Sequence, residues 1–329
     1  MSEAAVKTKA PSKVNARLIG DMAPYIGLVL VVVVFYFLTG GALLNSTNIQ
    51  AMINNVITTA MCTIGAVFVF GAGYFDMAIG GSLCFTVVLG AMATISSGSL
   101  FVGALVILGV SIVLACLKAL LASYVNVPFF IFTIILASIF NAVVLVVMGK
   151  ETTVMLKNAA QPIPEFNFTQ MSIISAISLV IFFVICVILF KLTPIGPKAK
   201  NLGGNVFAAK QSGISKTKTT FTVFIIGAIG IAIAAFLLMI RVRTVGSTTA
   251  GSLGNDVMVA LVLGGMPLSG GPRSKISAGL VGAVTITVLN SGLAIMGLNT
   301  GEVQIVRGIV FIVVVLVSSL SYRGKLLPR

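Results

Sequence analysis

Two aspartates set among glycines and apolar residues are the strongest candidates for chemistry in this chain. Asp76 lies in Gly71-Ala-Gly-Tyr-Phe-Asp-Met-Ala-Ile-Gly-Gly-Ser82, and Asp256 lies in Gly251-Ser-Leu-Gly-Asn-Asp256, before an apolar segment that ends in Gly264-Gly265. A carboxylate at bilayer depth is costly, so each aspartate is a candidate for a polar solute path or for ion coupling.

Each aspartate also has a structural interpretation. The glycines around Asp76 are consistent with a broken helix whose free backbone groups face a polar cavity, but a tight turn in which Asp76 caps the next helix is favoured. A cap beside a solute path would satisfy both interpretations. The return of the pattern around Asp256 fits either an inverted repeat with discontinuous helices or a chance similarity over a short stretch.

Side-chain amides supply a second kind of polar contact. Four asparagines lie within or at the edges of apolar segments: Asn54, Asn55, Asn141 and Asn290. Amides at such positions can hydrogen-bond sugar hydroxyls, but bonds between neighbouring helices are their commoner use.

A run of aromatic residues follows a proline in Asn126-Val-Pro-Phe-Phe-Ile-Phe-Thr133. Proline in a first turn predicts that a helix starts there. Phe129, Phe130 and Phe132 are candidates for an aromatic gate on a solute path that includes Thr133, although we expect at least two of the phenylalanines to pack against lipid.

Several kinds of chemistry are excluded by what the sequence lacks. The chain has no histidine, which removes imidazole acid–base catalysis and histidine-ligated metal sites. Gly149-Lys150 is followed by Glu151 and Gly324-Lys325 by Leu326, so the phosphate-binding pattern that ends in Gly-Lys-Ser/Thr is missing. We therefore expect no catalytic residue, metal site or cofactor in this chain. If ATP powers the protein, another chain binds it.

The elements that must position these residues are membrane-spanning helices. Hydrophobic residues make up 58% of the 329 residues and charged residues 9%, with a mean hydropathy of +1.16. A soluble domain has about 25% charged residues. Several apolar runs reach or approach the roughly 20 residues that cross a bilayer as a helix. The composition predicts an all-α polytopic membrane protein.

We expect about ten transmembrane helices in one domain, 22–321, between two basic tails, 1–21 and 322–329. The first tail is expected to be retained and not a signal peptide, because the apolar run after it is long and lacks a small-residue cleavage site. The candidate spans are 22–38, 49–70, 77–95, 101–123, 129–148, 171–190, 220–240, 256–268, 276–296 and 304–321. The run at 256–268 is short and interrupted by glycine, which suits a half-helix as well as a full crossing.

The distribution of charge orients these helices. The net charge of +14 gathers in the two tails, in a central loop at 191–219 and near Arg273, which fits retention by an anionic inner leaflet and not nucleic-acid binding. Ten crossings place both termini in the cytoplasm. This distribution of charge has one exception, because the topology places the basic residues Arg241 and Arg243 at the outer end of the seventh span.

The four cysteines lie in apolar runs and are expected to pack as small apolar residues: Cys62, Cys84, Cys116 and Cys186.

The central loop is an unusual part of the chain. Between Lys191 and Lys218 it carries six lysines and no carboxylate. It is too long for a simple hairpin, and its core from Asn205 to Ile214 is compatible with a helix. A short cytoplasmic helix that lies parallel to the membrane is what a transport channel needs to receive force from a soluble motor.

Four motifs, taken in order, point to a family. They are Gly73-Tyr-Phe-Asp-Met-Ala-Ile-Gly80, Val127-Pro-Phe-Phe-Ile-Phe-Thr133, Leu202-Gly-Gly-Asn-Val-Phe-Ala-Ala-Lys-Gln-Ser-Gly-Ile214 and Val262-Leu-Gly-Gly-Met-Pro-Leu-Ser-Gly-Gly271, with Asn290-Ser-Gly292-Leu after them. From about residue 45 to residue 321 the chain resembles the permease subunits of bacterial ABC importers of the ribose/xylose/galactose group. These permeases belong to the broader family that includes branched-chain amino acid permeases. The chain departs from the family pattern at several positions: Tyr74, Ala78, Pro197, Gly254 and Pro272-Arg273. The departures at Tyr74, Ala78 and Gly254 bear on the substrate more than on the fold.

The resemblance implies the ABC importer permease fold, with some discontinuous or half-helices, in a bacterial plasma membrane. It implies a second permease copy or a related permease, ABC ATP-binding subunits that hold ATP and Mg on the cytoplasmic face, and an extracytoplasmic substrate-binding protein. By this analogy residues 203–214 form a coupling helix, and the residues that couple to the ATPase are Gly203, Gly204, Asn205, Ala208, Ala209, Ser212 and Gly213.

The function that the resemblance implies is import of a small polar solute by alternating access. A monosaccharide is favoured as the substrate over a nucleoside or an autoinducer-type furanosyl compound. The alternative is an autonomous secondary transporter or channel that uses Asp76 or Asp256 for ion coupling. A membrane enzyme would have little to work with, since the chain lacks histidine and a cysteine cluster.

Overall fold

The computed structural model describes residues 13–125, 128–149, 151–159, 161–267 and 269–323, with the backbone alone for 13–21 and 317–323. Residues 1–12 and 324–329 of the predicted tails lie outside this range, and α1 begins at Lys13, inside the first predicted tail. The elements are α1 (Lys13–Leu38), η1 (Ala42–Leu44), α2 (Ser46–Gly71), α3 (Ile79–Ser97), α4 (Leu100–Tyr124), α5 (Phe129–Met148), β1 (Thr153–Met155), η2 (Leu156–Asn158), α6 (Phe168–Lys191), α7 (Ile195–Gly204), α8 (Val206–Gln211), α9 (Lys216–Val242), β2 (Thr244–Gly246), α10 (Leu253–Leu263), α11 (Ser277–Ile295) and α12 (Thr300–Arg323).

The predicted all-helical membrane architecture is confirmed. Seven helices in the described part of the chain are long and apolar enough to cross a membrane: α2, α3, α4, α5, α6, α9 and α11. The apolar part of α1, Met22–Leu38, is shorter, and so is α10. With 11 residues, α10 is a half-helix that is too short to cross a bilayer by itself, as the glycine-interrupted run at 256–268 allowed.

The helices α2 and α9 form the centre of the molecule. In the apolar window of each, 78% of the residues are buried, against 28% for α4 and 22% for α5 and α6. Glycines let the two central helices approach closely, since a Cβ atom on Gly65 would lie 3.2 Å from the backbone of Gly227. The buried Thr63 hydroxyl of α2 donates to the carbonyl of Gly279 on α11 at 2.8 Å. The outer helices present isoleucine, leucine and valine side chains on their exposed faces, as expected for contact with lipid.

Side chains and glycines mark where several helices begin and end. Asn167 and Gln170 form a capping box at the start of α6, which satisfies backbone N–H groups that a helix leaves free. The Ser215 side chain accepts the N–H of Lys218 and caps α9. At the end of α3, Gly98 has a φ of +64°, a left-handed conformation that glycine adopts without strain.

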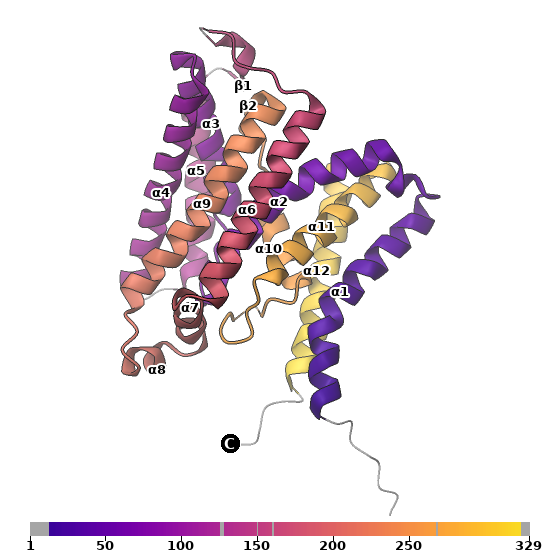
Figure 1. Ribbon diagram of the computed structural model, residues 1–329, viewed down its shortest axis with the longest axis vertical. Coiled ribbons are helices and arrows are strands. Elements are labelled where there is room, and N and C mark those ends of the chain that lie inside the picture. Colours follow the sequence, from indigo (N-terminus) through magenta and orange to yellow (C-terminus); the bar gives the residue numbers. More distant parts are fainter. Residues whose placement is uncertain (1–12, 126–127, 150, 160, 268, 324–329) are drawn as a thin grey trace, which may run out of the picture.

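The molecule has two distinct ends. The antiparallel pair β1–β2 lies at one end, and α7 and α8 lie at the other, together with the first turn of α1 and the last turn of α12 (Figure 1). At the β1–β2 end, Arg243 donates to the carbonyl of Pro164 at 3.0 Å and pairs with the exposed Glu165 at 3.2 Å. Arg243, the basic residue that did not fit the predicted charge distribution, therefore has a counter-charge beside it.

Candidate functional site

The first polar site lies in the break between α2 and α3, at residues 72–78. Asp76 is 2% exposed, and one of its oxygens, Oδ2, lies 2.7 Å from Lys118 Nζ on α4. The other oxygen accepts the backbone N–H of Ala78 at 2.8 Å. Asp76 closes the turn that leads into α3, as the helix-cap interpretation anticipated in part. It also lines a small cavity with Lys118 and Ser82.

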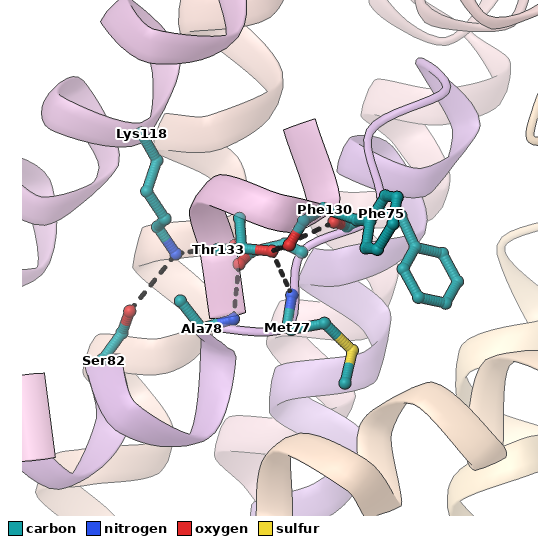
Figure 2. Close-up of polar contacts among 8 residues, drawn as sticks. Phe75, Met77, Ala78, Ser82, Lys118, Phe130 and Thr133 are labelled. Atoms are coloured by element: carbon teal, nitrogen blue, oxygen red, sulfur yellow. Dashed lines mark hydrogen bonds and ion pairs between the residues drawn. The ribbon is translucent and has the colours of Figure 1, made fainter. Parts of the chain in front are cut away.

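Lys118 and Thr133 fasten this break to two neighbouring helices. Lys118 also donates to Ser82 Oγ at 3.3 Å. Thr133 on α5 accepts the N–H of Met77 at 3.0 Å and donates to the carbonyl of Phe130 at 2.8 Å. Figure 2 shows Lys118 and Thr133 reaching the break from different helices. Thr133, predicted to line the path, holds the backbone of the break.

An aromatic cluster covers the start of the break. Phe129 lies 5.5 Å from Tyr74 and 5.4 Å from Phe224, measured between ring centroids. The Tyr74 hydroxyl is 2.8 Å from the Thr220 hydroxyl of α9. Phe130, by contrast, is 43% exposed on α5. Of the predicted aromatic gate, Phe129 is thus beside the polar site and Phe130 faces outward.

The second polar site joins α10, α11 and α12. Arg307 Nη1 lies 2.8 Å from Asp256 Oδ1, and their side chains are 12% and 9% exposed. Arg307 Nε donates to Asn290 Oδ1 at 2.6 Å, and Ser252 Oγ donates to Asp256 at 3.3 Å. The predicted residues Asp256 and Asn290 therefore meet in one network, although they are far apart in sequence.

The two aspartate segments touch each other through glycines. A Cβ atom on Gly80 would lie 2.7 Å from the backbone N of Gly254, and a Cβ on Gly254 would lie 3.2 Å from the backbone N of Gly80. A side chain at either position would separate α3 from α10. This contact gives a physical reason for Gly254, where the family that the sequence resembles commonly has an acidic residue.

Five glycines bring three backbone segments together, and we call this contact the glycine junction: Gly71, Gly73, Gly203, Gly270 and Gly271. A Cβ on Gly203 would overlap the carbonyl oxygen of Gly71 and lie 2.8 Å from the N of Gly73. The N–H of Gly271 donates to the carbonyl of Gly71 at 3.0 Å. The end of α7 thus packs directly against the start of the break that carries Asp76.

The prediction of one coupling helix over 203–214 is wrong. The structure has two helices there: Gly203 and Gly204 end α7, and the Asn205 side chain accepts the N–H groups of Phe207 and Ala208 to start α8. After α8, Gly213 has a φ of +76°, which ends the helical run. Extended backbone at Asn205, with a φ of −162°, separates the two helices.

The predicted coupling residues consequently have different surroundings. Gly203 belongs to the glycine junction, and Ala209 is buried. Exposed residues are Gly204, Asn205, Ala208, Ser212 and Gly213. Those five, with the 81% exposed Phe207 between them, form a surface that other proteins can reach.

Three predicted path residues lie apart from both polar sites. Asn55 and Asn141 are exposed on α2 and α5. Asn54 is half-buried on α2, and its Oδ1 has no hydrogen-bond partner among the described residues. The first polar site thus brings together Asp76, Thr133 and Phe129, and the second brings together Asp256 and Asn290.

The sequence patterns did not single out two cations that pair with the predicted aspartates. Lys118 and Arg307 are lone basic residues within the candidate spans 101–123 and 304–321. A basic side chain at bilayer depth is as costly as a carboxylate and calls for a partner. Pairing the lone cations with the lone aspartates was the signal that could have found both sites. Among the described residues, no three His, Cys, Asp or Glu side chains gather to hold a metal.

Lysines near α7 make its surroundings strongly positive. Lys200 Nζ lies 4.8 Å from the centroid of the Phe190 ring. Partial burial lowers the pKa of Lys200, and the positive charges of Lys191 and Lys275 lower it further. Such a cationic end suits contact with an anionic surface.

Comparisons with known proteins cover most of the chain. The sequence profile described as "Branched-chain amino acid transport system / permease component" matches residues 48–315. The ribose import permease protein RbsC of Bacillus subtilis (strain 168) is 28% identical over 90% of this chain and 91% of that protein. The galactofuranose transporter permease protein YtfT of Escherichia coli (strain K12) is 26% identical over 82% of this chain and 78% of that protein. The xylose transport system permease protein XylH of the same organism is 33% identical over 40% of this chain and 33% of that protein. No solved structure matches this chain.

Proposed function

The chain belongs to the family of permease components of branched-chain amino acid transport systems, and from this we propose that it is the transmembrane permease of an ATP-driven importer. It carries a small polar solute across a bacterial plasma membrane by alternating access, together with a second permease copy or a related permease. The observation that carries the proposal is the glycine junction. Because α7 meets the break by backbone contact, we expect a push on the exposed α8 to move the break that bears Asp76.

A monosaccharide is the proposed substrate. The supporting observation is that relatives aligned over most of this chain are named as permeases for ribose and galactofuranose, and a third relative as one for xylose. The competing substrates are a nucleoside and an autoinducer-type furanosyl compound. Binding of these compounds and of monosaccharides to the partner substrate-binding protein distinguishes between them.

The proposed partners follow from the two ends of the molecule. ABC ATP-binding subunits, holding ATP and Mg, dock on the cationic end that carries α7 and α8, where both described chain ends also lie (Figure 1). That end therefore faces the cytoplasm, in agreement with the retention of basic residues there. An extracytoplasmic substrate-binding protein docks at the β1–β2 end.

Ion coupling in an autonomous secondary transporter gains no support from the two aspartates. Asp76 is paired with Lys118 and Asp256 with Arg307. An ion that bound either carboxylate would have to displace a buried cation first, which is costly.

The proposal is tested by purifying the tagged chain in mild detergent with its neighbours and reconstituting the complex in liposomes. We expect an ABC ATPase and a substrate-binding protein to co-purify, and the liposomes to take up a radiolabelled monosaccharide only when ATP is supplied on the side that the ATPase faces. Uptake that persists without ATP and follows an ion gradient would instead identify a secondary transporter.

Phe207→Ala is expected to weaken binding of the ATPase subunit. An exposed aromatic residue at the centre of an interface contributes about 1–2 kcal/mol when truncated, which is roughly a 5- to 30-fold loss of affinity. The measurement is ATPase co-purification across a salt and detergent series. Leu192→Ala is the matched control, since Leu192 is 78% exposed just after α6 and lies outside α8. Equal retention of the ATPase by both variants would contradict the docking of the ATPase on α8.

A further inference from the structure

The break at 72–78 is held from several sides, but one of its bonds differs in kind. The Tyr74 hydroxyl bonds to Thr220, and the N–H of Met77 donates to Thr133. These are bonds between neutral groups. The contact of Asp76 with Lys118 joins two full charges at 2.7 Å, with side chains that are 2% and 4% exposed.

The surroundings of Lys118 are built to keep its ammonium in place. An ammonium donates three hydrogen bonds, and Asp76 and Ser82 accept two of them. Ser111 is 3% exposed, lines the same cavity, and its Oγ has no partner among the described residues. The cavity that Ser111 and Lys118 both line has a volume of about 20 Å³, enough for one water.

Lys118 also connects the break to the cytoplasmic end by a second route. It lies near the end of α4, where the carbonyl of Ser123 accepts a bond from Lys216 Nζ at 2.9 Å. Lys216 is the first residue of α9 and follows α8 after a short turn. A movement of α8 therefore reaches Asp76 through the glycine junction on one side and through α4 on the other.

We propose that Lys118 is a positioning residue of the transport cycle, whose charge holds Asp76 so that the break moves together with α4 when α7 and α8 move. This inference rests on the proposed function as an ATP-driven permease. Without the charge pair the break keeps its neutral bonds but loses its tie to α4. The ATPase subunit then hydrolyses ATP without solute being carried across the membrane.

The test compares the wild-type complex with the double variant Lys118→Met/Asp76→Asn in liposomes. Either single change would leave a buried charge without a partner and strongly destabilise the fold, whereas the double variant is neutral and its introduced amide oxygen still accepts the N–H of Ala78. We expect normal recovery of the complex, ATPase activity near that of the wild type, and a fall of about tenfold or more in solute carried per ATP. Lys118→Arg, which keeps the charge, should preserve most of the coupling. An unchanged ratio of solute to ATP in the double variant would overturn the proposal.

A second measurement does not depend on the transport activity. Cys62 lines the cavity beside Lys118 and is 1% exposed, so a maleimide reaches its thiol only when the cavity opens, and the labelling rate reports how often the cavity opens. In a background with Cys84, Cys116 and Cys186 replaced by alanine, the double variant should label several times faster than the parent. Equal labelling rates would overturn the role of Lys118, whereas a wild-type complex that shows no ATP-driven uptake would refute the proposed function alone.

Discussion

Arg307→Met is expected to lower the free energy of unfolding by about 3–5 kcal/mol, because it leaves the Asp256 carboxylate buried without a counter-charge. Arg307 contacts Asp256 at 2.8 Å and Asn290 at 2.6 Å. The Asp256 side chain is 9% exposed, so water cannot take the place of the guanidinium. The loss reaches three helices at once, since the three residues lie on α10, α11 and α12.

The measurement is thermal unfolding of the purified chain in detergent, with recovery from the membrane as a second readout. The matched control is Arg307→Met/Asp256→Asn, in which both charges are removed. We expect the double variant to regain most of the lost stability, since replacing a buried pair by neutral groups is often close to neutral. A double variant no more stable than the single one would show that the charge of Asp256 is not the cause.

Gly203→Ala is expected to abolish uptake in the reconstituted complex. The added Cβ would overlap the carbonyl oxygen of Gly71 and lie 2.8 Å from the N of Gly73 and 2.9 Å from the carbonyl carbon of Ala72. Those contacts are all backbone atoms, so no side chain can turn away to make room. Overpacking costs about 1–3 kcal/mol when side chains can shift, and here α7 itself has to move away from the break. We therefore expect uptake to fall by at least about tenfold.

The matched control for this variant is Gly109→Ala on α4, where an added Cβ atom would meet no atom within 4 Å. We expect uptake within about twofold of the wild type for this control. The measurement is ATP-driven uptake by the variant and its control, assayed side by side. Equal uptake by the two variants would mean that the backbone contact of α7 with the break does not transmit movement of the ATPase subunit to the break.

Periodic apolar runs were enough to find the membrane helices. The span at 129–148 coincides with α5, and the span at 49–70 lies within α2, because apolar length and the flanking proline and polar residues fix such helices locally. The Asp76–Lys118 and Asp256–Arg307 pairs needed a different argument, namely that a lone charge inside an apolar span calls for a partner. Which cation pairs with which aspartate depends on how separate helices pack, and no local signal in either segment records that.

The segment that carries α7 and α8 shows how local chemistry can be misread. A helix across 203–214 agrees with the composition, but the Asn205 side chain bonds to the N–H groups of the residues that follow it and so starts a new helix. Gly203 and Gly204 are small because α7 packs against other backbone segments there. The pairing of β1 with β2 was also not predicted, since three-residue strands leave little periodic signal.

The central position of α2 has a consequence for how the protein is made. α2 and α9 bury each other, yet α3 to α8 lie between them in the chain. During synthesis α2 leaves the ribosome long before its partner exists, with the hydroxyls of Thr58, Thr59 and Thr63 on a face that is buried only in the finished protein. Its mean hydropathy of 1.7 is lower than the 2.9 of α9. We therefore expect this face of α2 to reach its final packing only after α9 has entered the membrane.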